Sequence, residues 1–145
     1  MNLTTTRIGA MSSDSIERAY RLEAEVEKRP QFQLETHHSL HAGMYARTIM
    51  VPSGALACGA LIKIATLLII SGRGAVYIGG EAKEVEGYHV IEGDAGRKQA
   101  WLSFEDTYIT MIFPTAATSV EEAEAEFTDE ADRLQTRKEH VCLES

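Results

Sequence analysis

The chain has 145 residues, which is room for one domain with short extensions. Hydrophobic residues make up 44% and charged residues 25%, and this ordinary balance excludes wholesale disorder, collagen-like repeats and a long coiled coil. The 22 Asp and Glu residues outnumber the 14 Lys and Arg residues, giving a net charge of −8. No basic cluster interrupts this acidity, so we expect neither a nucleic-acid reader nor a protein that binds an anionic membrane surface.

The longest apolar run, 55–70, carries Lys63 in its middle. It falls short of the roughly 18–20 residues that cross a bilayer, so it predicts buried strands. No basic segment followed by an apolar one stands near the N-terminus, and we expect no secretory signal. The two cysteines, Cys58 and Cys142, have no CxxC spacing. We interpret them as idle thiols in a reducing compartment, with a disulfide between them as the alternative.

An amphipathic helix is predicted over residues 13–29. Ser13 or Asp14 can cap its start, and Pro30 ends it because proline cannot continue the hydrogen-bond ladder. Apolar residues recur at helical spacing along it: Ile16, Ala19, Tyr20, Leu22 and Val26.

The pattern then changes to short extended segments separated by turn residues. Gly79-Gly80 suits a two-residue hairpin turn, and Ser71-Gly72 and Gly87 predict further breaks. The predicted strands are 32–35, 44–51, 60–70, 74–79, 81–86, 88–93, 97–104 and 107–114. About eight strands with no helix between them predict an all-β sandwich or barrel.

The last section turns helical again. Ser119 followed by Glu122 is a capping box, and an apolar stripe follows at Val120, Ala123, Phe127, Ala131 and Leu134. Phe127 and Leu134 must be buried either on the β-core or on a neighbouring copy. The acidic run 121–132 predicts a solvated helix face, with a docking surface for a basic partner as the alternative. The predicted segments are therefore 1–30 (N-terminal helix), 31–115 (β-core) and 116–145 (C-terminal acidic amphipathic helix and tail).

Few residue patterns point to chemistry. His37, His38 and His41 could form half of a metal site, but surface or interface histidines are the commoner case. Glu105-Asp106 could do acid–base work, yet its place between two apolar strands favours a turn. The Gly-rich pieces SGRG and IGGE lack the lysine of a phosphate-binding loop, and no nucleophile motif is present.

Residues 36–115 nevertheless resemble small cupin-like proteins encoded by tailed bacteriophages. In that pattern a His-rich entry leads to G-x-Y-A-R and P-x-G, then to an I-x-S-x-G turn, a late P-x-G-x-(K/R) segment and E-D-T. The matching residues are Gly43, Tyr45, Ala46, Arg47, Pro52, Gly54, Ile69, Ser71, Gly96, Lys98, Glu105, Asp106 and Thr107. The resemblance implies a mainly β protein, in which a cupin-like double-stranded β-helix (a small barrel) is flanked by the two helices.

The resemblance also locates where a cupin would hold a metal. Cupins with metal chemistry carry His and Glu ligands on the strand before the S-x-G turn, where this chain has Ile62, Ala65 and Thr66. The later histidine is missing too, since that segment offers Lys98 and Gln99. Apolar and hydroxyl side chains do not supply the ligands that Fe, Mn or Zn needs. We therefore expect the fold without the metal, and no cofactor.

The first functional hypothesis is a non-catalytic structural or accessory assembly protein of a phage, acting as a homo-oligomer in the virion or the host cytoplasm. Other virion proteins are its further candidate partners. The residues predicted to contact a neighbouring copy or partner are Ile16, Tyr20, Phe127 and Leu134.

The second hypothesis is a small-ligand-binding module that uses the barrel or a subunit interface, for example for a nucleotide signal or a sugar. Arg47 and Lys98 would meet an anion, and Tyr45 and Trp101 would stack on a ring. The third is a metal-free isomerase-type enzyme that uses His89 or Glu105, which only the fold suggests.

Overall fold

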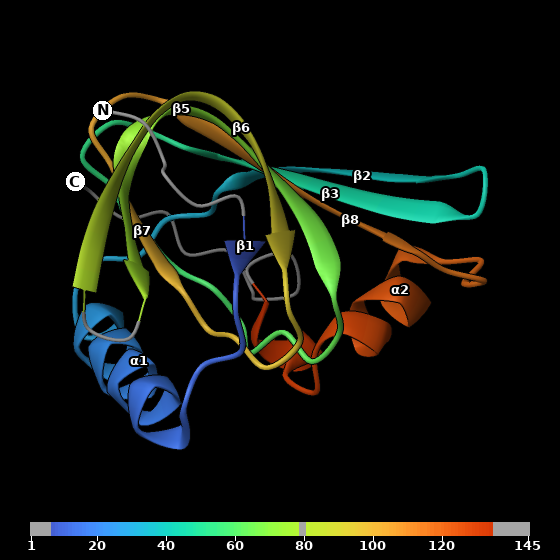
Figure 1. The fold of residues 1–145 in the computed structure, drawn as a ribbon, viewed down its shortest axis with the longest axis horizontal. Coiled ribbons are helices and arrows are strands. Elements are labelled where there is room, and N and C mark those ends of the chain that lie inside the picture. Colours follow the sequence, from blue (N-terminus) through green and yellow to red (C-terminus); the bar gives the residue numbers. More distant parts are fainter. Residues whose placement is uncertain (1–6, 79–80, 135–145) are drawn as a thin grey trace.

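The structure is a computed structural model that describes residues 7–78 and 81–134. Figure 1 shows an arched β-sheet with both helices on its concave side. The elements in chain order are β1 (Arg7–Ile8), α1 (Ser13–Glu27), β2 (Glu35–His41), β3 (Met44–Val51), β4 (Leu56–Cys58), β5 (Thr66–Ile78), β6 (Glu81–Gly93), β7 (Ala100–Ser103), β8 (Thr107–Pro114), α2 (Val120–Phe127) and a 3₁₀ turn (Ala131–Arg133). The prediction of a mainly β protein, with one helix before the β-core and one after it in the sequence, is confirmed.

The sheet is organised around the long antiparallel hairpin β5–β6. Its strands run in the order β1-β6-β5-β8-β3-β2, and β7 pairs with both β5 and β4. The first half of β5 pairs with β8, over 67–71, and its second half pairs with β7, over 74–77. The hairpin therefore belongs to two sets of strands, and the change of partner closes the barrel.

Two facing glycines produce that change of partner. Gly72 on β5 pairs with Gly87 on β6, and both have positive φ, 152° and 93°. A Cβ on Gly72 would collide with Thr107. The breaks predicted at Ser71-Gly72 and Gly87 are wrong, because the glycines bend continuous strands instead of ending them. The predicted turn at Gly79-Gly80 lies outside the described residues.

The strand predictions succeed for two regular strands of the sheet. Strands β3 and β8 match the predicted ranges 44–51 and 107–114 residue for residue. The predicted strand 32–35 is wrong, because the extended segment is β2, which begins at Glu35. Of the predicted strand 60–70, residues 60–65 are irregular apart from an isolated bridge between Ile62 and Arg97.

Helix α1 confirms the predicted N-terminal helix and ends two residues earlier than expected. Its cap is Ser12, whose side chain accepts a hydrogen bond from the Ser15 amide at 3.1 Å, and not Ser13 or Asp14. None of its residues is fully buried. Its predicted apolar stripe therefore rests on the barrel surface.

The C-terminal helix is shorter than predicted. The capping box is confirmed, because the Glu122 amide donates to Ser119 Oγ at 3.1 Å. The predicted continuation to Leu134 is wrong, because Thr128 is extended at φ −151° and ψ 148°. The Lys63 amide donates to the Phe127 carbonyl at 2.8 Å, so the barrel satisfies a carbonyl that would otherwise continue the helix.

One hydrophobic core connects all three predicted segments. It contains Ile8 near the N-terminus, Tyr45 and Phe113 from the sheet, and Phe127 and Leu134 from the C-terminal section. The Phe127 ring stacks on Tyr45 at 6.4 Å between centroids and meets Phe113 edge-on at 6.0 Å. No helix among the described residues has the length and apolar character that crossing a membrane requires.

Candidate functional site

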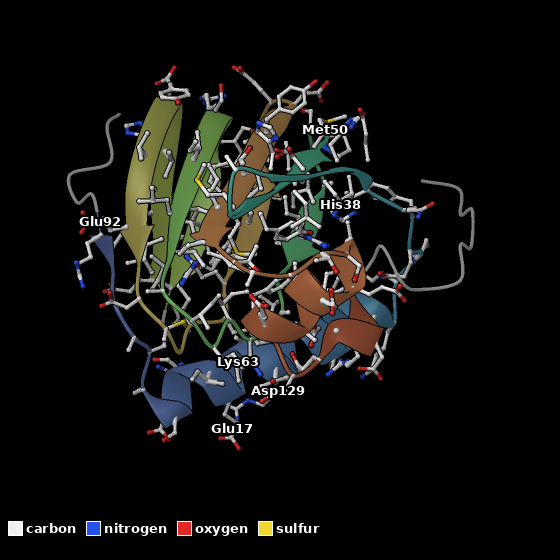
Figure 2. All side chains as sticks on the ribbon, turned by 90° about the vertical axis from the view of Figure 1, so that its right-hand side faces the viewer. Glu17, His38, Met50, Lys63, Glu92 and Asp129 are labelled. Carbon is white, nitrogen blue, oxygen red and sulfur yellow. The ribbon has the colours of Figure 1, made fainter. Side chains whose placement is uncertain are left out.

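Four polar side chains meet on the concave side of the sheet, next to α2. Arg47 on β3 pairs with His38 on β2, and Tyr45 points to the same face as Arg47 because side chains alternate along a strand. His38 Nδ1 lies 2.7 Å from the Tyr45 hydroxyl, and Arg47 Nη1 donates to Glu124 Oε2 at 2.9 Å. Figure 2 shows His38 between the β2–β3 hairpin and α2. We call His38, Tyr45, Arg47 and Glu124 the inner cluster.

Three members of the inner cluster, Tyr45, Arg47 and Glu124, are shielded from water, whereas His38 is exposed on β2. The side chain of Glu124 is 2% exposed and that of Arg47 is 11% exposed, so each charge depends on the other for compensation. The Arg47 guanidinium also lies 5.7 Å from the centre of the Phe127 ring. Burial, and then the nearby Arg47 charge, lower the pKa of His38. The neutral imidazole is therefore favoured, and the cluster fastens α2 to the hairpin.

A second set of charges lies between α1 and the barrel, around Lys98. Its ammonium group is 1% exposed, donates to the Gly59 carbonyl at 2.7 Å and pairs with Glu23 of α1 at 3.1 Å. It also lies 4.4 Å from the centre of the Tyr20 ring. The Tyr20 hydroxyl donates to Glu130 at 2.7 Å, and burial together with Glu130 raises the pKa of Tyr20 to about 12. Ion pairs and hydrogen bonds thus hold α1 against the barrel, although none of its residues is fully buried.

Arg97 is a third buried cation, at the end of the β5–β6 pair. Its guanidinium is hydrogen-bonded to Thr66 Oγ1, to the Asp94 carbonyl at 2.6 Å and to Gln99 Oε1 at 3.2 Å. A Cβ on Gly93 would overlap the guanidinium, so this glycine leaves room for it. Burial lowers the pKa of Arg97 to about 10, against the opposing effect of Asp94.

The four residues predicted to bind a ligand do not form one site. Tyr45 and Arg47 lie together in the inner cluster, and Lys98 lies against α1. Trp101 is 4% exposed on β7, and its indole N–H donates to Ser103 Oγ at 2.7 Å. Each of the four has its polar group engaged by another part of the same chain.

The predicted contact residues also fall into two groups. Ile16 and Tyr20 are half-buried on α1. Phe127 is 1% exposed and Leu134 is 8% exposed, and both belong to the chain's own core. For these two residues, burial on the β-core is the alternative that the structure shows.

The three clustered histidines are separated by the alternation of β2. His37 is exposed and lies 2.9 Å from Glu35, whereas His38 joins the inner cluster. His41 ends β2 beside the β2–β3 turn. They do not converge as a metal half-site would require.

The candidate acid–base residues are occupied by structural contacts. Asp106 lies in the β7–β8 connection, as the turn interpretation expected, and accepts a hydrogen bond from the Ser53 amide at 2.8 Å. Its neighbour Glu105 is exposed, 3.8 Å from Arg73. His89 Nε2 donates to the Glu86 carbonyl at 2.8 Å.

The residues at the expected metal position do not fit a metal. Ile62 and Ala65 have no donor atom, and Thr66 Oγ1 already accepts from the Arg97 guanidinium, a cation that would repel a metal ion. Burial raises the pKa of the Cys58 thiol to about 11, which disfavours the thiolate that a metal prefers. Within 7–78 and 81–134, no group of three or more His, Cys, Asp or Glu residues could hold a metal ion. Cys142 lies outside these residues.

Glu124 is the member of the inner cluster that the sequence interpretation missed. It was assigned to the solvated face of the acidic run, and that assignment is wrong for Glu124 and for Glu130, whose side chains are 2% and 19% exposed. Its position four residues after Val120 and three before Phe127 places it beside the apolar stripe of α2. This spacing is the signal that could have identified a buried acid.

A pocket of about 250 Å³ lies where the β2–β3 turn meets the segment after β8. None of the predicted ligand-binding residues lines it. Its lining residues are Leu40, His41, Ala42, Gly43, Met44, Thr115, Ala117 and Thr118.

Comparison with known proteins gives the fold. No family model and no curated protein matches the sequence. Among solved structures, ectoine synthase from P. lautus is 14% identical with a TM-score of 0.51, covering 67% of this chain and 75% of that one. A cupin 2 conserved barrel domain protein from Salinispora arenicola is 12% identical with a TM-score of 0.49, covering 62% and 84% of the two chains. A predicted oxalate decarboxylase from Thermotoga maritima is 13% identical with a TM-score of 0.48, covering 60% and 85%.

At these identities the likeness concerns architecture. The chain therefore has a cupin-like β-barrel fold with one helix before and one helix after it.

Proposed function

We propose that this protein is a non-catalytic building block that acts as a homo-oligomer on a metal-free, cupin-like barrel. The resemblance to cupin-like phage proteins extends the proposal to a structural or accessory role in phage assembly. The proposed location is accordingly the virion or the host cytoplasm, and other virion proteins are the further proposed partners.

One observation carries the proposal: the chain's own groups engage the side chains that could serve a ligand. Arg47 pairs with Glu124, and Lys98 pairs with Glu23. A charged group that binds a substrate must exchange its partners at low cost, but separating a buried ion pair leaves an uncompensated charge. These contacts support stability and precise placement of the helices more than turnover.

Native mass spectrometry of the full-length protein tests the proposal. We expect a mass that is a whole multiple of the chain mass, with no additional mass after mild desolvation. A monomer at every concentration would contradict the homo-oligomer, and turnover of a substrate by the purified protein would contradict the non-catalytic role.

Arg97 favours a second candidate, a small-ligand-binding module. Its side chain lies next to Gln99 Nε2, which is buried and has no hydrogen-bond partner. Within the described ranges, no carboxylate lies at ion-pair distance from the Arg97 guanidinium. An unpartnered amide donor beside a cation with no carboxylate at ion-pair distance suits a small anionic ligand. The same mass spectrum would then show extra mass on each chain, and Arg97→Gln should remove it.

A further inference from the structure

The convex side of the sheet presents a largely apolar surface with charged residues at its rim. Alternation along the strands directs one set of side chains away from the core, across β6, β5, β8 and β3. We call this set the outer face: Tyr88 and Val90 on β6, Leu67, Ile69 and Ser71 on β5, Tyr108, Thr110 and Ile112 on β8, and Ala46, Thr48 and Met50 on β3. Both helices lie on the opposite side of the sheet (Figure 1).

Large side chains on this face are exposed to solvent. The exposed fractions are 46% for Leu67, 47% for Val90, 51% for Tyr108 and 67% for Tyr88. The hydroxyls of Thr48 and Thr110 lie 2.7 Å apart and satisfy each other. The centre of the face can therefore be buried without leaving these two hydroxyls without a hydrogen-bond partner. Apolar, aromatic and charge-poor composition is typical of the centre of a protein interface.

We infer that the outer face binds the outer face of a second copy of this chain, about a two-fold axis that runs along β8. This inference rests on the proposed function, because it names the surface through which the homo-oligomer forms. Strand β8 is the middle strand of the five that form this side, in the order β6-β5-β8-β3-β2. The axis therefore places β5 against β3 of the other copy, and β6 against its β2.

The sizes of the facing side chains are complementary in this arrangement. The strand register defines three rows across the sheet, and each row meets the same row of the other copy. Leu67 then faces Ala46, and in the last row Ser71 faces Met50. A large residue meets a small one in both rows, which is how packed layers interdigitate. The sheets would stack in the aligned manner, about 10 Å apart.

The charges at the rim are complementary as well. Glu92 and Glu35 lie at diagonally opposite corners, because Glu92 shares a row with Ser39 and Glu35 shares a row with Tyr88. Figure 2 shows the same diagonal between Glu92 and Met50, the neighbour of Glu35. Tyr88 of one copy therefore faces Glu35 of the other, a phenol opposite a carboxylate, and no acid faces an acid. A chain of net charge −8 needs such an arrangement to pair with itself.

The area of the face sets the largest contact that two copies can make. Five strands about 4.8 Å apart and three rows about 7 Å apart cover about 500 Å² per copy. Two copies would together bury about 1,000 Å², which is near the lower limit for a specific protein interface. The carboxylates on these rows, Glu92 and Glu35, lie at the rim and already pair with Arg7 and His37, so the chemistry of the face favours a second copy over a basic partner.

Tyr108 provides the test, because an axis along β8 places Tyr108 of one copy opposite Tyr108 of the other. Tyr108→Glu and Tyr108→Lys should each weaken association by about 100-fold or more, since like charges then oppose each other. An equimolar mixture of the two variants should associate again as a heterodimer. Phe32→Glu is the control, because Phe32 is 41% exposed and lies outside the outer face. Analytical ultracentrifugation measures association, and circular dichroism verifies that each variant is folded.

The outcomes separate this inference from the proposed function. A wild-type protein that stays monomeric at the highest attainable concentration overturns both. If the wild type is an oligomer and neither Tyr108→Glu nor Tyr108→Lys dissociates it, the assignment of the outer face is overturned. The proposal of a homo-oligomer then stands. If folded single variants dissociate but their mixture does not associate, the axis along β8 is wrong.

Discussion

Replacing Phe127 by Ala distinguishes a core residue from a partner contact. The Phe127 ring is 1% exposed and packs against Tyr45 and Phe113. Burial of the ring contributes about 2 kcal/mol, and each aromatic pair adds about 0.5–1.5 kcal/mol. We therefore expect Phe127→Ala to lower the free energy of unfolding by about 3–5 kcal/mol, the usual range for a buried Phe.

Urea denaturation at one fixed protein concentration measures this loss, because stability of an oligomer depends on concentration. Phe32→Ala is the matched control and should cost less than about 1 kcal/mol, since Phe32 is exposed. If Phe127→Ala left unfolding unchanged but dissociated the oligomer, Phe127 would be a partner contact and the core assignment would fail. Phe127→Asp cannot make this distinction, because an unpaired buried carboxylate would unfold the chain.

Three further predictions concern the inner cluster and the barrel. Glu124→Leu removes the carboxylate beside the buried Arg47 charge and should lower the free energy of unfolding by about 3–5 kcal/mol. The double variant Glu124→Leu with Arg47→Met should recover most of this loss. If urea denaturation shows equal losses for the single and the double variant, the pairing is contradicted. Gly74→Ala places a methyl group against the Leu102 carbonyl and should cost at least about 1–3 kcal/mol by thermal unfolding, unlike Gly9→Ala, whose methyl group would make only an ordinary contact with Asp94 at 3.9 Å. The lowered pKa of His38 stabilises the fold above about pH 6.5, and this contribution should be lost as the pH falls through the folded-state pKa. Denaturation against pH should show that loss in the wild type and not in His38→Gln.

The sequence predicts those elements whose signals are local. Strands 44–51 and 107–114 alternate regularly, and the Ser119–Glu122 box begins α2 as expected. The prediction of a break at Gly72 is wrong because a glycine that ends a strand and one that bends it look alike in a sequence. Only the position of Gly87 opposite it, fifteen residues later, distinguishes the two.

The candidate site was less predictable, because the burial of a charge depends on partners far away in the chain. Lys98 and Glu23 are 75 residues apart, and Arg47 and Glu124 are 77 residues apart. Arginine and lysine are mostly exposed in proteins, so a sequence interpretation treats them as free to bind. Here each contacts an acid that a helix brings to the barrel.

These buried cations also determine where a function can reside. The position at which the resemblance to cupins would place a metal receives the Arg97 guanidinium through Thr66, and the concave side beside α2 is closed by Arg47 and Glu124. Restoring metal ligands at Ile62 or Thr66 alone should therefore not create a metal site, because the positive charge of Arg97 would remain beside it. With the concave side closed in this way, the convex side carries most of the large exposed apolar side chains, among them Leu67, Val90 and Tyr108. The association that we propose would use this apolar side of the sheet.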